Sequence, residues 1–338
     1  MKYAVSVLIP VYNVSAHIEK CAHSLFNQTL ENVEYIFVDD MSPDDSVAKL
    51  NAVIEQYPAR KNDIKIIKHS INSGQACARM TAFNASSAEY LSFVDSDDFI
   101  DTDMLKTLYK TAIKNNADIV VSDIRFVYDG GETLIKPDNI SGTGKRQAIK
   151  LVEGKDCFNA VWNKLIKRDL FAKIDITFPK NFTFQEDRYF MIQLYFNANT
   201  IVKVDKAFYN YVRYNVNATT AKTTAIHFEN TITFWHLIEQ FFQQQGIYDN
   251  YEMIVSKAKV KNKIGLMMST KSFSLRKKYF NLFRKEEIYW SQQPQFMQEI
   301  KLGEKLMLSF SVKRQLRLSY LLYLFIAIKT KFRKKRLL

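Results

Sequence analysis

Two clusters of carboxylates follow apolar runs early in the chain. The segment "FVDSDD" carries Asp95, Asp97 and Asp98, and the segment "FVDD" carries Asp39 and Asp40. Carboxylates this close together repel one another and raise one another's pKa, so a positive partner is needed to keep them ionised. No Lys or Arg lies beside either cluster in the sequence. Oxygen ligands without a cationic neighbour are typical of a site for a hard divalent cation.

Strand and helix patterns that alternate along the first half of the chain predict where these clusters lie. Buried strands are predicted over 3–11, 33–40, 64–69, 90–95 and 117–123, and helices over 15–28, 43–57, 74–86 and 101–115. This alternation indicates βαβ units and an α/β fold with a mostly parallel sheet flanked by helices. Such sheets bind ligands outside the carboxyl ends of their strands.

One edge of the predicted sheet is therefore expected to gather both carboxylate clusters and the segment "PVYN" at 10–13. We predict that the cation is Mg²⁺ or Mn²⁺ and that it carries a diphosphate, because these ions use one or two carboxylates together with waters and substrate phosphates. The alternative is that each Asp only caps the helix that follows its strand. The phosphate-binding patterns GxxxxGK and GxGxxG are absent, so a glycine loop is not expected to hold the phosphates.

Six segments between about residue 3 and about residue 220 form an ordered set. They are "SVLIPVYN", "FVDDMSPDDS", "NSGQACARM", "EYLSFVDSDD", "VWNKLIKRDLF" and "FQEDRYF". In this order and spacing they resemble the inverting, family-two nucleotide-sugar glycosyltransferases, whose GT-A fold is Rossmann-like. The resemblance implies transfer of a hexose or N-acetylhexosamine from a nucleotide donor, with UDP expected, to a hydroxyl of a glycan or lipid-linked acceptor. Surface polysaccharide or glycolipid synthesis is the implied setting.

The resemblance also implies a role for each matched residue on the donor side. Arg79 would lie near the diphosphate or the ribose, and Asp39 would hydrogen-bond the uracil imide. The remaining matched residues are Asp40, beside Asp39, and the three that would lie against the nucleoside, Pro10, Val11 and Tyr12.

The metal and the catalytic base are implied in the same way. Asp95, Ser96 and Asp97 match the family's Asp-x-Asp motif, in which Asp97 would ligate the metal. Asp95 would be a second ligand or would reach the ribose or a metal-bound water, with Ser96 between the two. The segment "QED" matches the stretch that supplies the base, with Asp187 as the first candidate and Glu186 as the second. One such carboxylate is enough for an inverting displacement.

Departures from the family pattern occur at two positions, and one matched segment has two readings. Met41 and Met80 stand where the family usually has Gly and Asn. If the turn at Met41 needs a positive φ, a residue with a side chain is strained there. In "VWNKLIKRDLF", Trp162 and Lys164 either line the acceptor side or are ordinary core and surface positions.

The C-terminal quarter differs in charge from the rest of the chain. Residues 1–254 carry 27 Lys and Arg against 31 Asp and Glu, a net −4, whereas residues 255–338 carry 21 against 4, a net +17. An uncharged run at 318–328 is flanked by cations and, as a helix, would rise only about 16 Å, too short to span a bilayer. We expect the tail at 313–338 to lie in an anionic membrane interface. The alternative is a buried helix that ends in a solvated basic tail.

The remaining expectations concern organisation and partners. We predict a catalytic domain over 1–220 and a basic helical region over 221–338. The N-terminus lacks the proportions of a signal peptide, and the three cysteines match neither a disulfide framework nor a zinc site, so a cytoplasmic protein on the inner face of the cell membrane is expected. No nucleic-acid motif accompanies the basic charge, so nucleic acid is not an expected partner. A nucleotidyltransferase of related fold and a catalytically silent nucleotide-sugar-binding subunit are the alternative functions.

Overall fold

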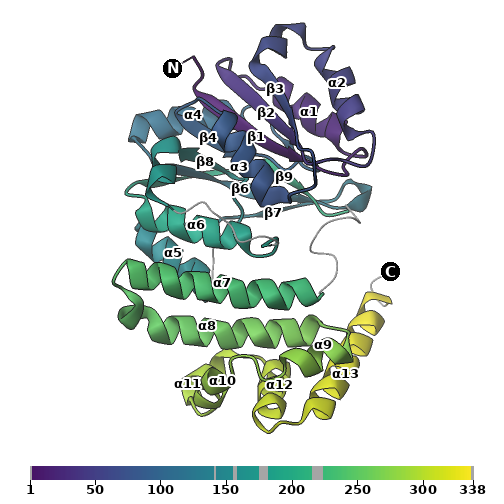
Figure 1. Ribbon diagram of the computed structural model, residues 1–338, viewed down its shortest axis with the longest axis vertical. Coiled ribbons are helices and arrows are strands. Elements are labelled where there is room, and N and C mark those ends of the chain that lie inside the picture. The colour runs from purple at the N-terminus through teal and green to yellow at the C-terminus, as the bar shows by residue number, and fades with distance from the viewer. Residues whose placement is uncertain (1, 141, 155–157, 175–181, 215–223, 336–338) are drawn as a thin grey trace. The chain divides into compact units, whose positions relative to one another are not determined.

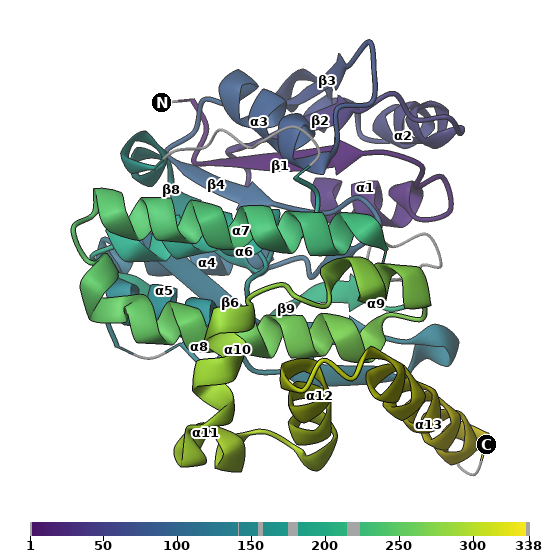
Figure 2. The same cartoon turned by 60° about the horizontal axis from the view of Figure 1, so that its bottom comes forward.

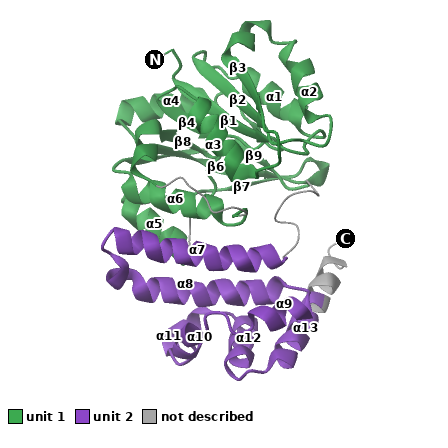
Figure 3. Cartoon of the chain, viewed as in Figure 1, with its two compact units in different colours: residues 1–216 green, residues 217–338 purple. Residues whose placement is uncertain are grey.

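The computed structural model describes residues 2–140, 142–154, 158–174, 182–214 and 224–335, with side chains described as far as residue 327. The chain divides into two compact units, residues 1–216 and 217–338 (Figure 3). The domain boundary predicted at 220/221 lies in 215–223, outside the described residues. Each unit is described by itself.

Unit 1 contains a nine-stranded sheet within its described residues. Its strands are β1 (Val5–Val11), β2 (Val33–Asp39), β3 (Ile64–Lys68), β4 (Tyr90–Phe93), β5 (Phe99–Ile100), β6 (Ile119–Val127), β7 (Thr133–Lys136), β8 (Lys164–Lys167) and β9 (Ile201–Val212). Its α-helices are α1 (Ile18–Phe26), α2 (Ser46–Ile54), α3 (Gln75–Ala85), α4 (Met104–Asn115), α5 (Gly144–Glu153) and α6 (Glu186–Asn197). Short 3₁₀ helices occur at Pro58–Asp63, Asp129–Gly131 and Arg168–Lys173.

The strand order is β3-β2-β1-β4-β8-β6-β9-β5, and β7 pairs with β6. Because β8 is antiparallel to both β4 and β6, strands β1, β2, β3, β4, β6 and β9 all run in one direction. The mostly parallel sheet flanked by helices is therefore confirmed (Figures 1 and 2). Every strand and helix predicted in the first half of the chain is present, with ends that differ by a few residues.

The central strands are buried on both faces, which is why their sequences are continuous apolar runs. Every residue of β1 and β2 is buried, and the core includes residues of α1 and α4. Val11 pairs with Asp39 in the parallel register of β1 and β2, and Val94, just after β4, bonds to Leu8 of β1. The carboxyl ends of β1, β2 and β4 therefore lie next to one another at one edge of the sheet, as predicted.

Unit 2 consists of helices in its described part. They are α7 (Ala225–Gln244), α8 (Tyr248–Ser269), α9 (Phe273–Tyr279), α10 (Arg284–Ser291), α11 (Pro294–Glu299), α12 (Leu302–Val312) and α13 (Leu316–Lys335). Helices α7 and α8 lie side by side (Figures 1 and 2), and a core around Phe228, Ile264 and Leu308 joins this unit's helices. Within the described part of the chain, none of the helices combines the length and the apolar content needed to cross a bilayer.

The turn after β2 has the strained backbone that the sequence suggested. Met41 has a φ of +59°, in the left-handed region that costs a residue with a side chain about 1–2 kcal/mol. The side chain is half exposed, so packing does not account for its presence. The turn is fixed by Ser42, whose backbone N–H donates to Asp39 Oδ1 at 2.8 Å and whose Oγ accepts from the Asn13 N–H at 3.2 Å.

Replacing Met41 with Gly should therefore relieve strain. We expect Met41→Gly to raise the free energy of unfolding by about 1 kcal/mol relative to Met41→Ala, because the higher unfolded-state entropy of glycine cancels only part of the gain. Urea unfolding of the two variants measures the difference. Met41→Ala is the matched control, since it removes the same exposed side chain and keeps a Cβ. Equal midpoints would contradict the assignment of strain.

Candidate active site

The carboxylate cluster after β4 has a buried arginine as its positive partner. Arg79, on α3, donates from Nη2 to Asp95 Oδ1 at 2.8 Å, and its Nη1 donates to Asp187 Oδ1 at the start of α6. Gln75, one turn earlier on α3, donates to the same Asp95 oxygen at 2.9 Å. No Lys or Arg adjoins the cluster in the sequence, but the fold brings Arg79 to it from another element.

Arg79 is the residue that brings two predicted groups of the site together. Its residue surface is only 7% exposed. Burial lowers the pKa of its guanidinium, but the charges of Asp187 and Asp95 outweigh that effect and raise it, so the group stays charged. Its Nε is buried without a hydrogen-bond partner among the described residues. A buried donor without a partner is costly, and such groups occur where a structure stores strain or serves catalysis.

Asp40 positions α3 instead of facing an open pocket. Its Oδ1 accepts from the Ser73 N–H at 2.8 Å, and its Oδ2 accepts from the Gly74 N–H at 2.7 Å. The His69 ring lies 2.7 Å from Oδ1 through Nδ1. Gly74 immediately precedes α3 and has a φ of +87°, a conformation that glycine adopts without strain. Asp40 therefore fixes the start of the helix that carries Arg79.

Asp98 is also a structural carboxylate. It is buried, with Oδ2 accepting from Tyr209 Oη at 2.9 Å and Oδ1 accepting from the Val212 N–H at 2.7 Å. Burial raises its pKa well above the usual range, and the charges of Asp97 and Asp95 add to the rise. The Tyr209 oxygen also accepts from the Asp95 N–H at 3.1 Å. Asp98 and β9 thereby hold the turn at 95–98, which we call the acidic turn.

Trp162 and Lys164 are both buried, so Lys164 is not the surface position that one reading allowed. The Trp162 ring stacks on Tyr209 with ring centroids 4.2 Å apart. Lys164 Nζ donates to the Ala160 carbonyl at 2.7 Å and lies 3.4 Å from the Asp138 carboxylate. The matched segment therefore packs, through Trp162, against Tyr209, which supports the acidic turn.

The residues predicted to meet the nucleoside lie where β1 ends. Pro10 and Val11 are buried in the strand, whereas Tyr12 is 47% exposed. The Asp40 N–H donates to the Val11 carbonyl at 2.9 Å, so Tyr12 leaves the sheet beside the end of β2. Asp39 is buried and uses Oδ1 for the turn bond to Ser42.

The acidic turn contains the two side chains that could hold a metal. Asp95 accepts both of its side-chain bonds through Oδ1, so Oδ2 is the oxygen that can face a ligand. Asp97 is partly exposed and Ser96, between them, is buried. No group of three or more His, Cys, Asp or Glu in the described part of the chain could form a metal site alone. Two carboxylates still fit Mg²⁺ or Mn²⁺ when phosphates and waters complete the shell.

Glu186 and Asp187 form the first turn of α6, after Gln185 at a φ of +69°. Burial raises the pKa of Glu186 to about 7, with Asp187 adding to the rise and Arg79 opposing it. Burial likewise raises the pKa of Asp187 against the opposing charge of Arg79. A carboxylate with a pKa raised toward neutrality is suited to accept a proton in catalysis.

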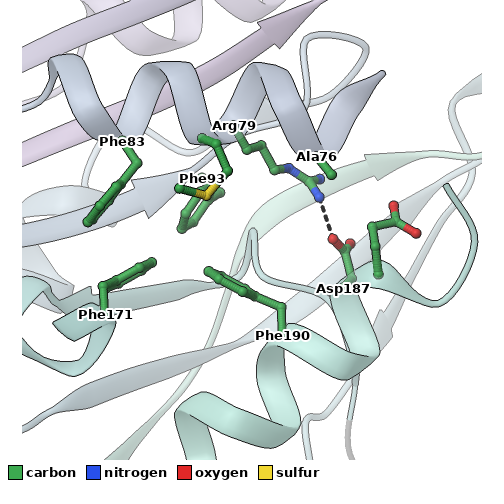
Figure 4. Close-up of a pocket in the computed structure, with 9 residues that line it drawn as sticks. Ala76, Arg79, Phe83, Phe93, Phe171, Asp187 and Phe190 are labelled. Carbon is green, nitrogen blue, oxygen red and sulfur yellow. Dashed lines mark hydrogen bonds and ion pairs between the residues drawn. The ribbon is translucent and has the colours of Figure 1, made fainter. Parts of the chain in front are cut away.

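An apolar pocket borders this carboxylate pair (Figure 4). Its apolar wall comes from α3, β4, the turn at Arg168–Lys173 and α6 and is formed by Ala76, Met80, Phe83, Phe93, Phe171 and Phe190. Figure 4 shows the Arg79–Asp187 pair on one side of the pocket and the four phenylalanine rings on the other. Water is scarce at such a wall, which is why burial dominates the pKa of both carboxylates.

The mixed α/β sheet has an Asp-x-Asp turn at one strand end, and the buried Glu186 and the partly exposed Asp187 lie at the start of a helix beside it. This arrangement fits the class of nucleotide-sugar glycosyltransferases. The family model "Glycosyl transferase family 2" matches residues 6–175. The chain belongs to this family and is a glycosyltransferase.

Similar proteins agree with the family assignment. The "Uncharacterized glycosyltransferase EpsJ" of Bacillus subtilis is 30% identical over 258 residues, which are 73% of this chain and 70% of that protein. The "Poly(ribitol-phosphate) beta-glucosyltransferase" of Bacillus spizizenii is 34% identical over 215 residues, 62% of this chain and 32% of that protein. The fold is similar to the crystal structure of S. aureus TarS 1-349 in complex with UDP, with a TM-score of 0.67, 19% identity and coverage of 95% of this chain and 90% of that one.

The raised pKa of Glu186 predicts a pH-dependent cost to stability. In the folded state Glu186 holds its proton up to about pH 7, whereas in the unfolded chain it loses it near pH 4.3. The folded state therefore binds more protons in this window, and stability falls as the pH rises through it. We expect Glu186→Gln to gain about 1–3 kcal/mol over the wild type between pH 5 and pH 8.

Urea unfolding at the two pH values measures this gain. The exposed carboxylate Glu132 supplies the matched control, because Glu132→Gln makes the same chemical change without burial. A Glu186→Gln difference that is the same at both pH values would contradict the raised pKa.

Proposed function

We propose that the protein transfers a hexose or N-acetylhexosamine from a UDP-sugar to a hydroxyl of a glycan or lipid-linked acceptor, with inversion at the anomeric carbon. The observation that carries the proposal is the Arg79 bridge. It joins Asp95 of the acidic turn to the candidate base Asp187 through one guanidinium, so donor-side and acceptor-side groups share one site. The TarS structure with UDP and the polymer-modifying relatives support UDP as the nucleotide and surface polysaccharide or glycolipid synthesis as the setting.

The chain's own residues supply a single-displacement mechanism. Asp187 takes the proton of the acceptor hydroxyl as that oxygen attacks the anomeric carbon, and the nucleoside diphosphate leaves from the opposite side. Arg79 places its positive charge beside both groups. The apolar wall of the pocket limits water near the base, which strengthens each of these charge interactions.

A divalent metal belongs to this proposal. Asp97 and Asp95 would hold Mg²⁺ or Mn²⁺, and the bound ion would supply the positive charge that balances the leaving diphosphate. Asp98 and Tyr209 keep the acidic turn in place for that purpose.

The nucleoside would lie at the ends of β1 and β2. Tyr12 offers an exposed ring, and Asp39 has Oδ2 in addition to the oxygen that bonds Ser42. Asp40 contributes indirectly, by fixing α3, because both of its oxygens accept bonds from the loop at 73–74.

The enzyme would act in the cytoplasm, and α13 would attach it to the inner face of the cell membrane. This helix turns Ser319 and Tyr323 inward, and its Leu321 and Phe325 are 57% and 65% exposed. Apolar side chains that stay exposed on the open face of a helix, with cations flanking them, can enter the boundary between headgroups and acyl chains. These exposures favour the membrane over the buried-helix alternative. Ile328, the last residue of the uncharged run, lies beyond the described side chains.

The base assignment predicts a separation of binding from turnover. We expect Asp187→Asn to lower turnover by about 10²–10⁴-fold, because no group then accepts the hydroxyl proton. UDP affinity should stay within a few-fold of the wild type, since the residues proposed for the nucleotide are unchanged. Turnover is measured as UDP release in the presence of acceptor, and affinity by calorimetry. Glu186→Gln is the neighbouring control, and a larger loss of turnover in that variant would make Glu186 the base.

The metal assignment predicts a loss in binding as well as in activity. We expect Asp97→Asn to weaken Mn²⁺ binding in the presence of UDP by about tenfold or more, because one of two protein carboxylates is lost. Electron paramagnetic resonance of Mn²⁺ measures this without turnover. Asp129→Asn, at an exposed turn, is the matched charge control. Full wild-type activity in the presence of a chelator would refute the metal.

A further inference from the structure

A groove in unit 2 lies between α9 and the N-terminal end of α13. It has a volume of about 550 Å³ and is lined by Phe273, Lys277, Arg314, Leu316, Arg317 and Leu318, together with Gln315. We call it the α9–α13 groove. Figures 1 and 2 show α9 beside α13, and the rings of Phe273 and Tyr320 join the two helices with centroids 5.2 Å apart. Its size lies within the range of small-molecule sites.

The three cations of the groove have no acidic partner among the described residues. Lys277, Arg314 and Arg317 are exposed, and none of them forms an ion pair within the part of the chain that the structure describes. The four carboxylates of residues 255–338 are all engaged elsewhere: Glu286 with Lys259, Glu287 with Lys263, Glu299 with Lys257 and Lys261, and Glu304 with the Lys301 N–H. The three groove cations therefore carry part of the excess positive charge of this region without an acidic partner among the described residues.

Apolar side chains continue from the groove along one face of α13. Phe273 and Leu318 are 39% and 41% exposed at the groove, and Leu321 and Phe325 follow Leu318 at helical spacing with still greater exposure. The opposite face packs into the unit, with Ser319 buried. Exposed apolar surface beside uncompensated cations matches the two parts of an anionic lipid, the headgroup and the acyl region.

We propose that the α9–α13 groove binds the phosphate headgroup of an anionic membrane lipid, with the apolar face of α13 in the acyl boundary. This inference rests on the proposed membrane association and adds a specific headgroup site to it. Lys277, Arg314 and Arg317 supply the charge, and the dipole at the N-terminal end of α13 has the same sign. A soluble phosphodiester polymer would satisfy the cations but would leave Phe273 and Leu318 exposed to water, so the lipid is the better match.

The test compares charge at the groove with equal charge elsewhere. The groove variant is Lys277→Gln/Arg314→Gln/Arg317→Gln in the full chain. The control variant is Lys110→Gln/Lys114→Gln/Lys285→Gln, which removes three exposed cations that form no ion pair with any described residue. Cosedimentation is measured with vesicles of phosphatidylcholine alone and of phosphatidylcholine with phosphatidylglycerol. We expect the groove variant to lose about tenfold or more in affinity for the anionic vesicles, and the control to lose clearly less.

A third variant separates this inference from the membrane proposal itself. Leu321→Glu/Phe325→Glu disrupts the apolar face and leaves the groove cations in place. If this variant loses vesicle binding and the groove variant equals the charge control, the membrane proposal stands and the headgroup site is wrong. If the intact chain binds neither vesicle, both are wrong. Binding of soluble poly(glycerol phosphate) by the intact chain without binding to vesicles would overturn the lipid in favour of a polymer. Circular dichroism and UDP release confirm that each variant is folded.

Discussion

A buried guanidinium has to be paired with carboxylates, and the active site is built around that constraint. Arg79 cannot lose its proton in the protein interior, so its burial is tolerable only with negative partners in contact. It finds them on two elements, Asp95 after β4 and Asp187 at the start of α6. Asp40 fixes the start of the helix that carries it. Three segments far apart in sequence are therefore placed relative to one another by a single charge.

The elements that position the site could be predicted from the sequence, because buried parallel strands and amphipathic helices leave strong local patterns. The edge at which β1, β2 and β4 end followed from topology alone. The roles of individual carboxylates did not follow. Asp98 bonds to Tyr209, 111 positions later in the chain, and Arg79 bonds to Asp187, 108 positions later. Such pairings depend on packing, and no local pattern distinguishes a carboxylate that holds a turn from one that faces a ligand.

In unit 2, too, the sequence predicted the general features but not the pairing of individual residues. Charge counting located the positive excess in the C-terminal quarter, and the short uncharged run indicated an interfacial helix. Counting could not show which cations are already neutralised. Lys263, for example, pairs with Glu287 at 2.6 Å where both are buried, so it contributes nothing to a surface potential. Three exposed cations without an ion pair among the described residues, Lys277 on α9 and Arg314 and Arg317 near the start of α13, line one groove because α9 lies against α13.

The electrostatics of the active site set opposing demands on its carboxylates. The apolar wall favours their neutral forms, which is why burial is the largest influence on the pKa of both Glu186 and Asp187. Arg79 favours their ionised forms. A base must be ionised to accept a proton, yet it accepts a proton more readily when its pKa is raised. Arg79 contacts Asp187 directly and reaches Glu186 only through its field, so it favours the ionised form of Asp187 more strongly than that of Glu186. The two neighbouring carboxylates therefore meet these demands in different proportions, because the guanidinium opposes the effect of burial most strongly at the carboxylate that it contacts.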